Sequence, residues 1–154
     1  MNNVKLSRIG IINVKFGENV KIVEPVNLYD CSIGDDVFIG PFVEIQNNVI
    51  IGDRSKIQSH SFICELVRIG SDCFIGHGVK FINDTFKSGK PAMGDKSVWR
   101  ETLIENNVLI GSNSTILPIK ICKNVVIGAG AVVTKNIDES GIYAGNPAKL
   151  IRKL

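Results

Sequence analysis

The sequence is dominated by large apolar residues that recur at every sixth position. The longest uninterrupted run has nine members: Ile33, Ile39, Ile45, Ile51, Ile57, Ile63, Ile69, Ile75 and Phe81. The same spacing returns from Ile104, with one five-residue step before Ile121, and weaker copies precede the run from Phe16. Side chains return to the same face about every 3.6 residues in an α-helix and about every two residues in a strand. Neither a helix nor one long alternating strand therefore produces a spacing of six.

Each repeat also carries a smaller residue four positions after the large one, as at Val37, Val43 and Ser55. A strand of about four residues and a corner of about two account for both positions, with the large side chain inside and the small one where the corner narrows. Three such units close a triangular coil of about 18 residues, which pairs with the next coil through parallel strands. The chain has 23 Ile and 16 Val against 5 Ala. Because β-branched residues favour strands, we expect an all-β triangular prism.

The composition excludes several other classes of protein. The net charge of +3 is too small for a nucleic-acid surface. The most apolar stretch, residues 125–133, is too short to span a membrane, and no apolar leader follows Met1. The four cysteines are far apart and form no C-x-x-C pair, which is typical of a reduced cytoplasmic chain without disulfides or a bound metal. We therefore expect residues 1–154 to form a single cytoplasmic domain, with a loop at about 84–101 and a tail at about 139–154.

The repeat is interrupted once, between Asp84 and Arg100, by a polar stretch that contains Gly and Pro. A loop of this length inside a compact repeat is a tolerated insertion or a functional segment. In the functional interpretation, the loop leaves the prism and covers a site at a neighbouring subunit. The lone Trp99 then anchors the returning chain against apolar surface.

Residues 18 positions apart lie above one another in such a prism. Asn47, Glu65 and Asn83 have this spacing and each follows an inward apolar residue by two positions, so they are expected to form an outward polar column that ends at Asp84 and the loop. Two further columns are expected, one of Pro41, Ser59 and His77 and one of Phe42, His60 and Gly78. A polar column beside a loop is a candidate sugar-binding site, although any outward face of a prism is polar.

The hexads resemble those of the hexapeptide-repeat acyltransferases over most of the chain, from about Phe16 to Asp138. The segment 144–149, Ala-Gly-Asn-Pro-Ala-Lys, is similar to the C-terminal signature of that family. Segments 40–46, 56–65 and 76–84 look most like the N-acetyltransferases that act on nucleotide-linked 3-amino sugars. The resemblance implies a left-handed parallel β-helix, a homotrimer with sites between subunits, acetyl-CoA as co-substrate and no metal. It also implies a role in making sugars for surface polysaccharides such as lipopolysaccharide.

A sugar amine is a good nucleophile once it is neutral, so it needs positioning rather than a strong base. Asn83 and Asp84 suit that role as catalytic residues, because an amide oxygen can accept from the amine and a carboxylate can orient it or take a proton. The candidate substrate-binding residues are Asn47, Glu65, His60, His77 and Phe81. The candidate contacts to acetyl-CoA are Ser112, Ala129, Lys135, Asn146, Pro147, Lys149 and Arg152.

The sequence therefore predicts an acetyl-CoA-dependent N-acetyltransferase that acts on the 3-amino group of a dTDP- or UDP-linked 3-amino-3-deoxy hexose. An O-acetyltransferase that uses His60 or His77 as a base is the main rival. A prism that serves only as an assembly module is a second rival. A zinc enzyme on the same prism requires three histidines, and this chain has two.

Overall fold

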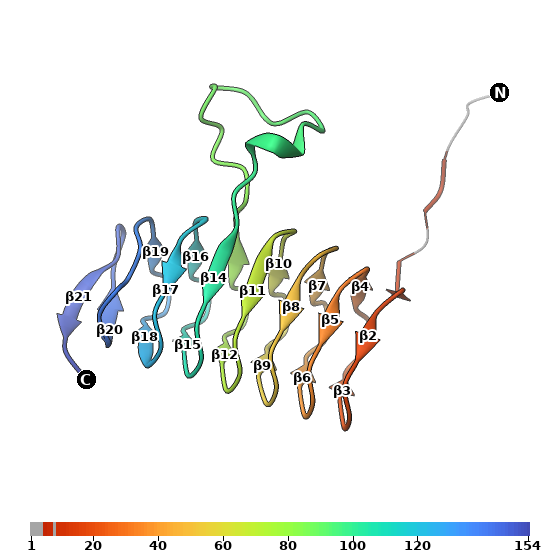
Figure 1. Ribbon diagram of the computed structural model, residues 1–154, viewed down its shortest axis with the longest axis horizontal. Coiled ribbons are helices and arrows are strands. Elements are labelled where there is room, and N and C mark those ends of the chain that lie inside the picture. Colours follow the sequence, from red (N-terminus) through yellow and green to blue (C-terminus); the bar gives the residue numbers. More distant parts are fainter. Residues whose placement is uncertain (1–4, 8) are drawn as a thin grey trace.

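The computed structural model describes residues 5–7 and 9–154, and it is a parallel β-helix of stacked triangular coils (Figure 1). Nearly all strands pair in parallel with strands one coil away, and together they form three long sheets. Sheet A contains β1 (Ile11–Ile12), β4 (Asn27–Tyr29), β7 (Glu44–Ile45), β10 (Phe62–Ile63), β13 (Lys80–Phe81), β16 (Thr115–Ile116) and β19 (Val132–Val133). Sheet B contains β2 (Lys15–Phe16), β5 (Ser32–Ile33), β8 (Ile50–Ile51), β11 (Val67–Ile69), β14 (Thr102–Ile104) and β17 (Lys120–Ile121). Sheet C contains β3 (Lys21–Ile22), β6 (Phe38–Ile39), β9 (Lys56–Ile57), β12 (Phe74–Ile75), β15 (Leu109–Ile110), β18 (Val125–Ile127), β20 (Gly141–Ala144) and β21 (Lys149–Arg152).

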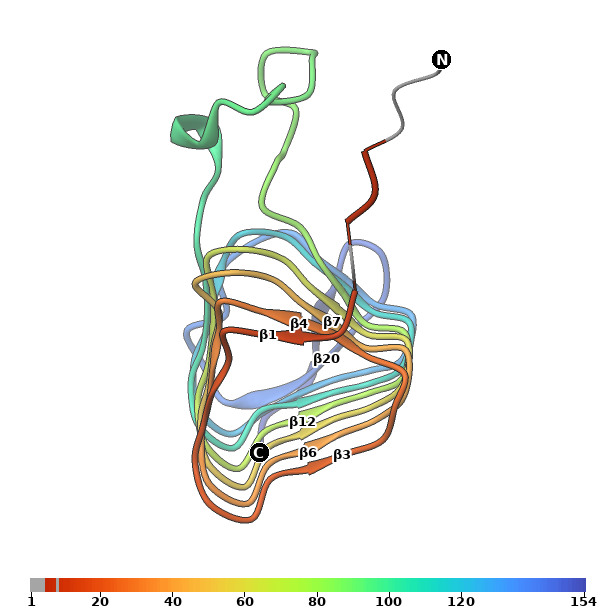
Figure 2. The ribbon, with the colours of Figure 1, turned by 90° about the vertical axis from the view of Figure 1, so that its right-hand side faces the viewer.

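The coil is left-handed, as the family resemblance implied. Figure 2 looks along the prism from the end that holds the N-terminal coils. From this side the chain passes from sheet B on the left to sheet C at the bottom and then to sheet A at the top, and it recedes as it turns. A path that turns anticlockwise while it recedes is a left-handed coil.

The repeating large residues fill the prism, as predicted. All nine members of the run from Ile33 to Phe81 are buried, and so are Ile104, Ile110 and Ile116. The small position holds Val, Cys or Ser in most coils and Thr102 or Ala131 in two others, and the buried serines bond to the backbone at the corners. Ser55 Oγ, for example, donates to the carbonyl of Gly70 at 2.9 Å and accepts from the amide of Cys73 at 3.0 Å. The interior polar atoms are thereby satisfied without a break in the stack.

Three corners connect the sheets, and we name them by what they hold. The loop corner leads from sheet A to sheet B (residues 46–48, 64–66, 82–101, 117–119 and 134–136), the aspartate corner from sheet B to sheet C (34–37, 52–55, 70–73 and 105–108), and the histidine corner from sheet C to sheet A (40–43, 58–61, 76–79, 111–114 and 128–131). Fifteen described non-glycine residues, most of them at corners, have positive φ, and nine of them are Asn or Asp. These two residue types tolerate the left-handed region best, so they mark the turns.

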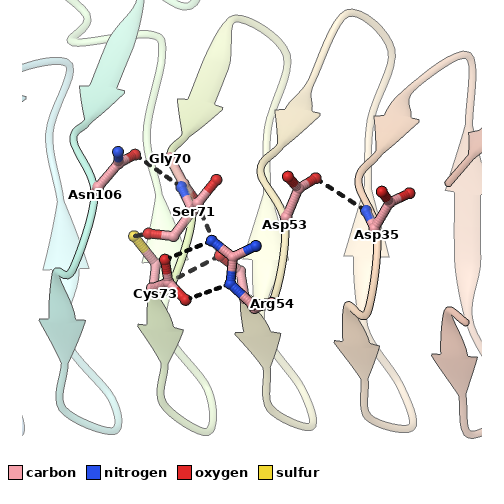
Figure 3. Close-up of polar contacts among 9 residues, drawn as sticks. Asp35, Asp53, Arg54, Gly70, Ser71, Cys73 and Asn106 are labelled. Carbon is pink, nitrogen blue, oxygen red and sulfur yellow. Dashed lines mark hydrogen bonds and ion pairs between the residues drawn. The ribbon is translucent and has the colours of Figure 1, made fainter. Parts of the chain in front are cut away.

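The aspartate corner shows how one coil fixes the next (Figure 3). Asp53 Oδ1 accepts from the amide of Asp35 at 3.0 Å, and Asn106 Oδ1 accepts from the amide of Ser71 at 2.9 Å. A Cβ atom at Gly70 would clash with the side chain of Asn106, so glycine there leaves room for this side chain. The ladder gives a structural reason why polar residues recur at this corner.

The regular stack is interrupted by one long loop and ends in a hairpin. Residues 82–101 rise from the prism between β13 and β14 and contain one short 3-10 helix, η1 (Lys96–Val98) (Figures 1 and 2). At the C-terminal end, β21 pairs antiparallel with β20 and closes sheet C. Across the described residues, no helix has the length and apolar character needed to cross a membrane.

Candidate functional site

The loop corner contains a buried carboxylate, Glu65, which is only 6% exposed. Lys96 of η1 lies against it, with Nζ 2.7 Å from Oε2. Asn48 Nδ2 donates to the other carboxylate oxygen at 3.3 Å, and Gln46 Oε1 accepts from the Glu65 amide at 3.2 Å. Glu65 is therefore not the outward residue that the column predicted, because the returning loop covers it and neutralises its charge.

Asn83 and Asp84 lie where the loop leaves the prism. Asn83 Nδ2 donates to the carbonyl of Glu65 at 3.2 Å, which confirms the 18-residue register between these two positions. Within the described chain, Asn83 Oδ1 accepts no hydrogen bond. Asp84 accepts backbone N–H groups on both oxygens, from Phe86 and from Ala92, each at 2.8 Å. Asp84 thus organises the loop, while the amide oxygen of Asn83 keeps its accepting capacity.

The loop contacts the prism through the ion pair of Lys96 with Glu65, and Lys96 also lies beside Trp99. Lys96 Nζ lies 5.5 Å from the centroid of the Trp99 ring as well as against Glu65. Trp99 is half-buried, which is consistent with the predicted anchoring role, and its indole Nε1 is buried without a hydrogen-bond partner among the described residues.

The histidine corner carries the two predicted outer columns. Ser59 Oγ lies 2.8 Å from His77 Nδ1, and the rings of Phe42 and His60 lie 4.8 Å apart, so both columns have the expected register. Phe42 and His60 have φ of 60° and 63°, in the left-handed region that neither residue favours. Lys80 Nζ donates to the carbonyl of His60. Unlike the side chain of Glu65, both imidazoles are exposed.

Several predicted coenzyme contacts continue the histidine corner toward the C-terminal end. The amide of Asn113 donates to the carbonyl of His77, and the amide of Gly130 donates to the carbonyl of Ser112, both at 2.8 Å. Ser112 and Ala129 therefore stack above His77. The turn that holds Asn146 and Pro147 follows, because the amide of Val132 donates to the carbonyl of Gly145 at 3.0 Å.

Other predicted site residues lie elsewhere. Phe81 is fully buried in the core, so its assignment as a substrate contact is wrong. Lys135 follows β19 at the loop corner, whereas Lys149 and Arg152 are exposed on β21 at the end of sheet C. Asn47 is half-buried at the loop corner. Within one chain, most of the predicted residues thus divide between the loop corner and the histidine corner, with sheet A between them, while Phe81 lies in the core and Lys149 and Arg152 lie at the end of sheet C.

Sequence reasoning missed Lys96 and Gln46, which hold Glu65. Lys96 lies in the loop, where no repeat fixes the position of a side chain, and Gln46 occupies a position that varies from hexad to hexad. The corner residues with positive φ could have been predicted, because Asn or Asp recurs at these positions with the same six-residue period as the large apolar residues.

All four cysteines are free thiols, and burial affects their pKa. Burial raises the pKa of the Cys31 thiol to about 11 and that of Cys64 to about 12. Burial also raises the pKa of Cys73 and of Cys122. All four thiols therefore stay protonated near neutral pH. Among the described residues, no group of three or more His, Cys, Asp or Glu side chains could hold a metal ion.

Two family models match the repeats. Residues 30–65 match the bacterial transferase hexapeptide (six repeats), and residues 102–135 match the hexapeptide repeat of succinyl-transferase. The bifunctional protein GlmU of Streptococcus uberis is 31% identical over 150 residues, which cover 93% of this chain and 32% of that protein. The chain spans about a third of the length of the GlmU proteins that it matches.

Two solved structures illustrate the likeness in fold. AntD, an N-acyltransferase from Bacillus cereus in complex with dTDP and coenzyme A, has a TM-score of 0.80 at 24% identity, with coverage of 92% of this chain and 84% of that one. Perosamine N-acetyltransferase from Caulobacter crescentus, in complex with CoA and GDP-perosamine, has a TM-score of 0.64 at 17% identity, with coverage of 94% and 58%. The two matched models and the left-handed coil show that the chain is built from hexapeptide repeats similar to those of bacterial transferases.

Proposed function

We propose that this protein is an acetyl-CoA-dependent N-acetyltransferase that acetylates the 3-amino group of a nucleotide-linked 3-amino-3-deoxy hexose. The observation that carries the proposal is Asn83, whose amide nitrogen is held by the Glu65 carbonyl while its oxygen has no partner in the described chain. An amide oxygen in this position can accept a hydrogen bond from a neutral amine and aim its lone pair. The neighbouring complexes with dTDP and with GDP-perosamine support a nucleotide-sugar acceptor, and their CoA supports the acyl donor.

In the proposed reaction, the neutral amine attacks the thioester carbonyl of acetyl-CoA. An N–C bond forms, the C–S bond breaks, and the coenzyme thiolate takes the proton that the nitrogen loses. Asn83 positions the amine, and Asp84 fixes the loop that surrounds it. The pantetheine arm follows the histidine corner past Ser112 and Ala129 to the turn at Asn146 and Pro147. The product serves the synthesis of a surface polysaccharide.

The separation of the two corners within one chain supports a homotrimer. If the loop corner of one copy faces the histidine corner of the next, the amine and the thioester meet between subunits. The exposed Phe42 and Phe74 side chains are then covered by neighbouring copies. Sedimentation should give a trimer at micromolar concentration, and a stable monomer would contradict this assembly.

A second candidate, O-acetylation with a histidine base, rests on the bond between Ser59 and His77. This contact could orient the imidazole to take a proton from a hydroxyl. One experiment separates the candidates: acetyl-CoA turnover is measured with a nucleotide-linked 3-amino hexose and with its 3-hydroxy analogue. We expect turnover with the amine alone, and preferential turnover of the alcohol would reverse the assignment.

A further inference from the structure

The loop lines an open cavity of about 410 Å³ in which cationic side chains outnumber carboxylates. Three cations line it, Lys87, Lys90 and Arg100, against one carboxylate, Asp84. The hydroxyls of Thr85, Ser88 and Ser97 complete its polar lining. The charged groups that face this cavity therefore sum to +2.

No carboxylate of the described residues forms an ion pair with any of these three cations. Four ion pairs occur among the described residues, and none includes Lys87, Lys90 or Arg100. The one carboxylate in the cavity already accepts two backbone N–H groups. By contrast, Lys96 of the same loop is paired with Glu65. Of these four loop cations, Lys96 is therefore paired with the prism, whereas the other three line the cavity.

The cavity adjoins the site proposed for the amine. Asp84 lines it, and the amide of Arg100 donates to the carbonyl of Asn83 at 3.2 Å. In a nucleotide-linked hexose, the diphosphate joins the sugar at C1, two ring carbons from C3. A sugar whose amine lies at Asn83 therefore has its diphosphate close enough to that residue to reach this cavity.

We propose that this loop cavity binds the diphosphate of the nucleotide-linked sugar through Lys87, Lys90 and Arg100. The inference rests on the proposed function and adds the place where the substrate's charge is recognised. A diphosphate that is esterified at both ends carries two negative charges, which match the surplus of the lining. The planar guanidinium of Arg100 can donate two parallel hydrogen bonds to phosphate oxygens, and the lysines add point charges.

The test is equilibrium binding by calorimetry, so that it does not depend on turnover. The ligands are dTDP, UDP, thymidine, inorganic pyrophosphate, inorganic phosphate and CoA. The variants are Lys87→Gln, Lys90→Gln and Arg100→Gln, with Lys21→Gln as the matched control on an exposed lysine of β3. A charge-assisted contact of this kind is worth about tenfold to a hundredfold in Kd.

We expect Arg100→Gln to raise the Kd of the preferred nucleotide at least about tenfold and each lysine variant to raise it less. The Kd of CoA should not change. Pyrophosphate should compete with the nucleotide, and thymidine should not. In the wild-type protein, nucleotide affinity should fall as salt rises. This measurement needs no variant and so does not depend on how the variants fold.

Three results would overturn the assignment. Unchanged nucleotide affinity in all three variants would show that the cations face solvent only. Weaker CoA binding with normal nucleotide binding would assign the cavity to the coenzyme. Inorganic phosphate that binds as tightly as dTDP would show a site for free phosphate. If pyrophosphate binds through these cations while neither nucleotide does, the nucleotide-sugar function fails but recognition of a diphosphate in this cavity stands.

Discussion

The loop corner and the histidine corner use the same repeat in opposite ways. At the loop corner, Glu65 is buried, paired with Lys96 and surrounded by the amides of Gln46, Asn48 and Asn83. At the histidine corner, the side chains of His60 and His77 are exposed, and each contacts a residue of its own column, Phe42 and Ser59 respectively. A group held by several hydrogen bonds can position a substrate precisely, whereas an exposed imidazole needs another surface to fix it. The comparison therefore favours the loop corner as the place where the acceptor is oriented.

The largest effect is expected from Asn83→Ala, which tests this comparison directly. Loss of the amide that aligns the amine should lower kcat/KM by about 10- to 1000-fold. The matched changes at the other corner, His60→Ala and His77→Ala, should cost much less in kcat. Steady-state kinetics with a nucleotide-linked amino sugar measure all three variants.

The pH profile provides a second readout of the same comparison. If no histidine acts as a base, kcat/KM should rise with pH as the sugar ammonium loses its proton, and both histidine variants should keep that profile. If a histidine variant abolishes turnover while Asn83→Ala remains near wild type, the histidine corner holds the catalytic group, and a histidine-base mechanism replaces amine positioning by Asn83.

The next effect is on stability and concerns the ion pair that attaches the loop. Lys96→Met leaves the nearly buried Glu65 carboxylate without its cation, so we expect a loss of about 1–3 kcal/mol in the free energy of unfolding. Glu65→Gln combined with Lys96→Met should recover part of this loss, because no uncompensated charge remains. Thermal or urea unfolding measures both variants.

The ion pair between Arg54 and Asp72 at the aspartate corner is a suitable control. Its atoms are 2.8 Å apart, but the two side chains are 55% and 42% exposed, so Arg54→Met should change stability very little. The pairing with Arg54 lowers the pKa of Asp72. Any contribution from this pair is therefore present above the ordinary pKa of an aspartate and is lost as the pH falls through the lowered value. If Arg54→Met lowers the free energy of unfolding as much as Lys96→Met does, the burial of Glu65 is not what makes its ion pair the stronger one.

The repeat explains why most of the fold was predictable. A period of six determines which side chains are buried, and the 18-residue coil determines which residues stack, so the contact between Ser59 and His77 follows from the sequence alone. The exceptions occur where that period stops. Glu65 was predicted to face outward, but it is covered by Lys96, which lies 31 residues later in a loop without periodicity. Lys135 lies at the loop corner rather than with Asn146, because it follows Val133 of sheet A by two positions, as Asn47 follows Ile45, so a count of the hexads would have placed it there.

A smaller effect is expected at the end of sheet C. Lys149→Ala combined with Arg152→Ala should raise the KM for acetyl-CoA by up to about tenfold with little change in kcat, because phosphate contacts stabilise the ground state and the transition state alike. The KM for the amino sugar should stay the same, and the thermal stabilisation that CoA gives should decrease. A fall in kcat with an unchanged KM would move these two residues from coenzyme binding to the chemical step.

The smallest effect is expected from Trp99→Phe, and its sign is informative about how the corners meet. Within one chain the indole Nε1 is buried and unpartnered, and an unsatisfied buried donor is unfavourable. If the chain alone sets its environment, phenylalanine removes that donor, keeps most of the apolar contact, and changes stability by less than about 1 kcal/mol, toward greater stability. If the loop corner of one copy faces the histidine corner of another, the donor finds a partner there, and the same change destabilises the assembly. Unfolding of Trp99→Phe measured across protein concentration separates the two cases, because only an intersubunit hydrogen bond makes the loss depend on concentration.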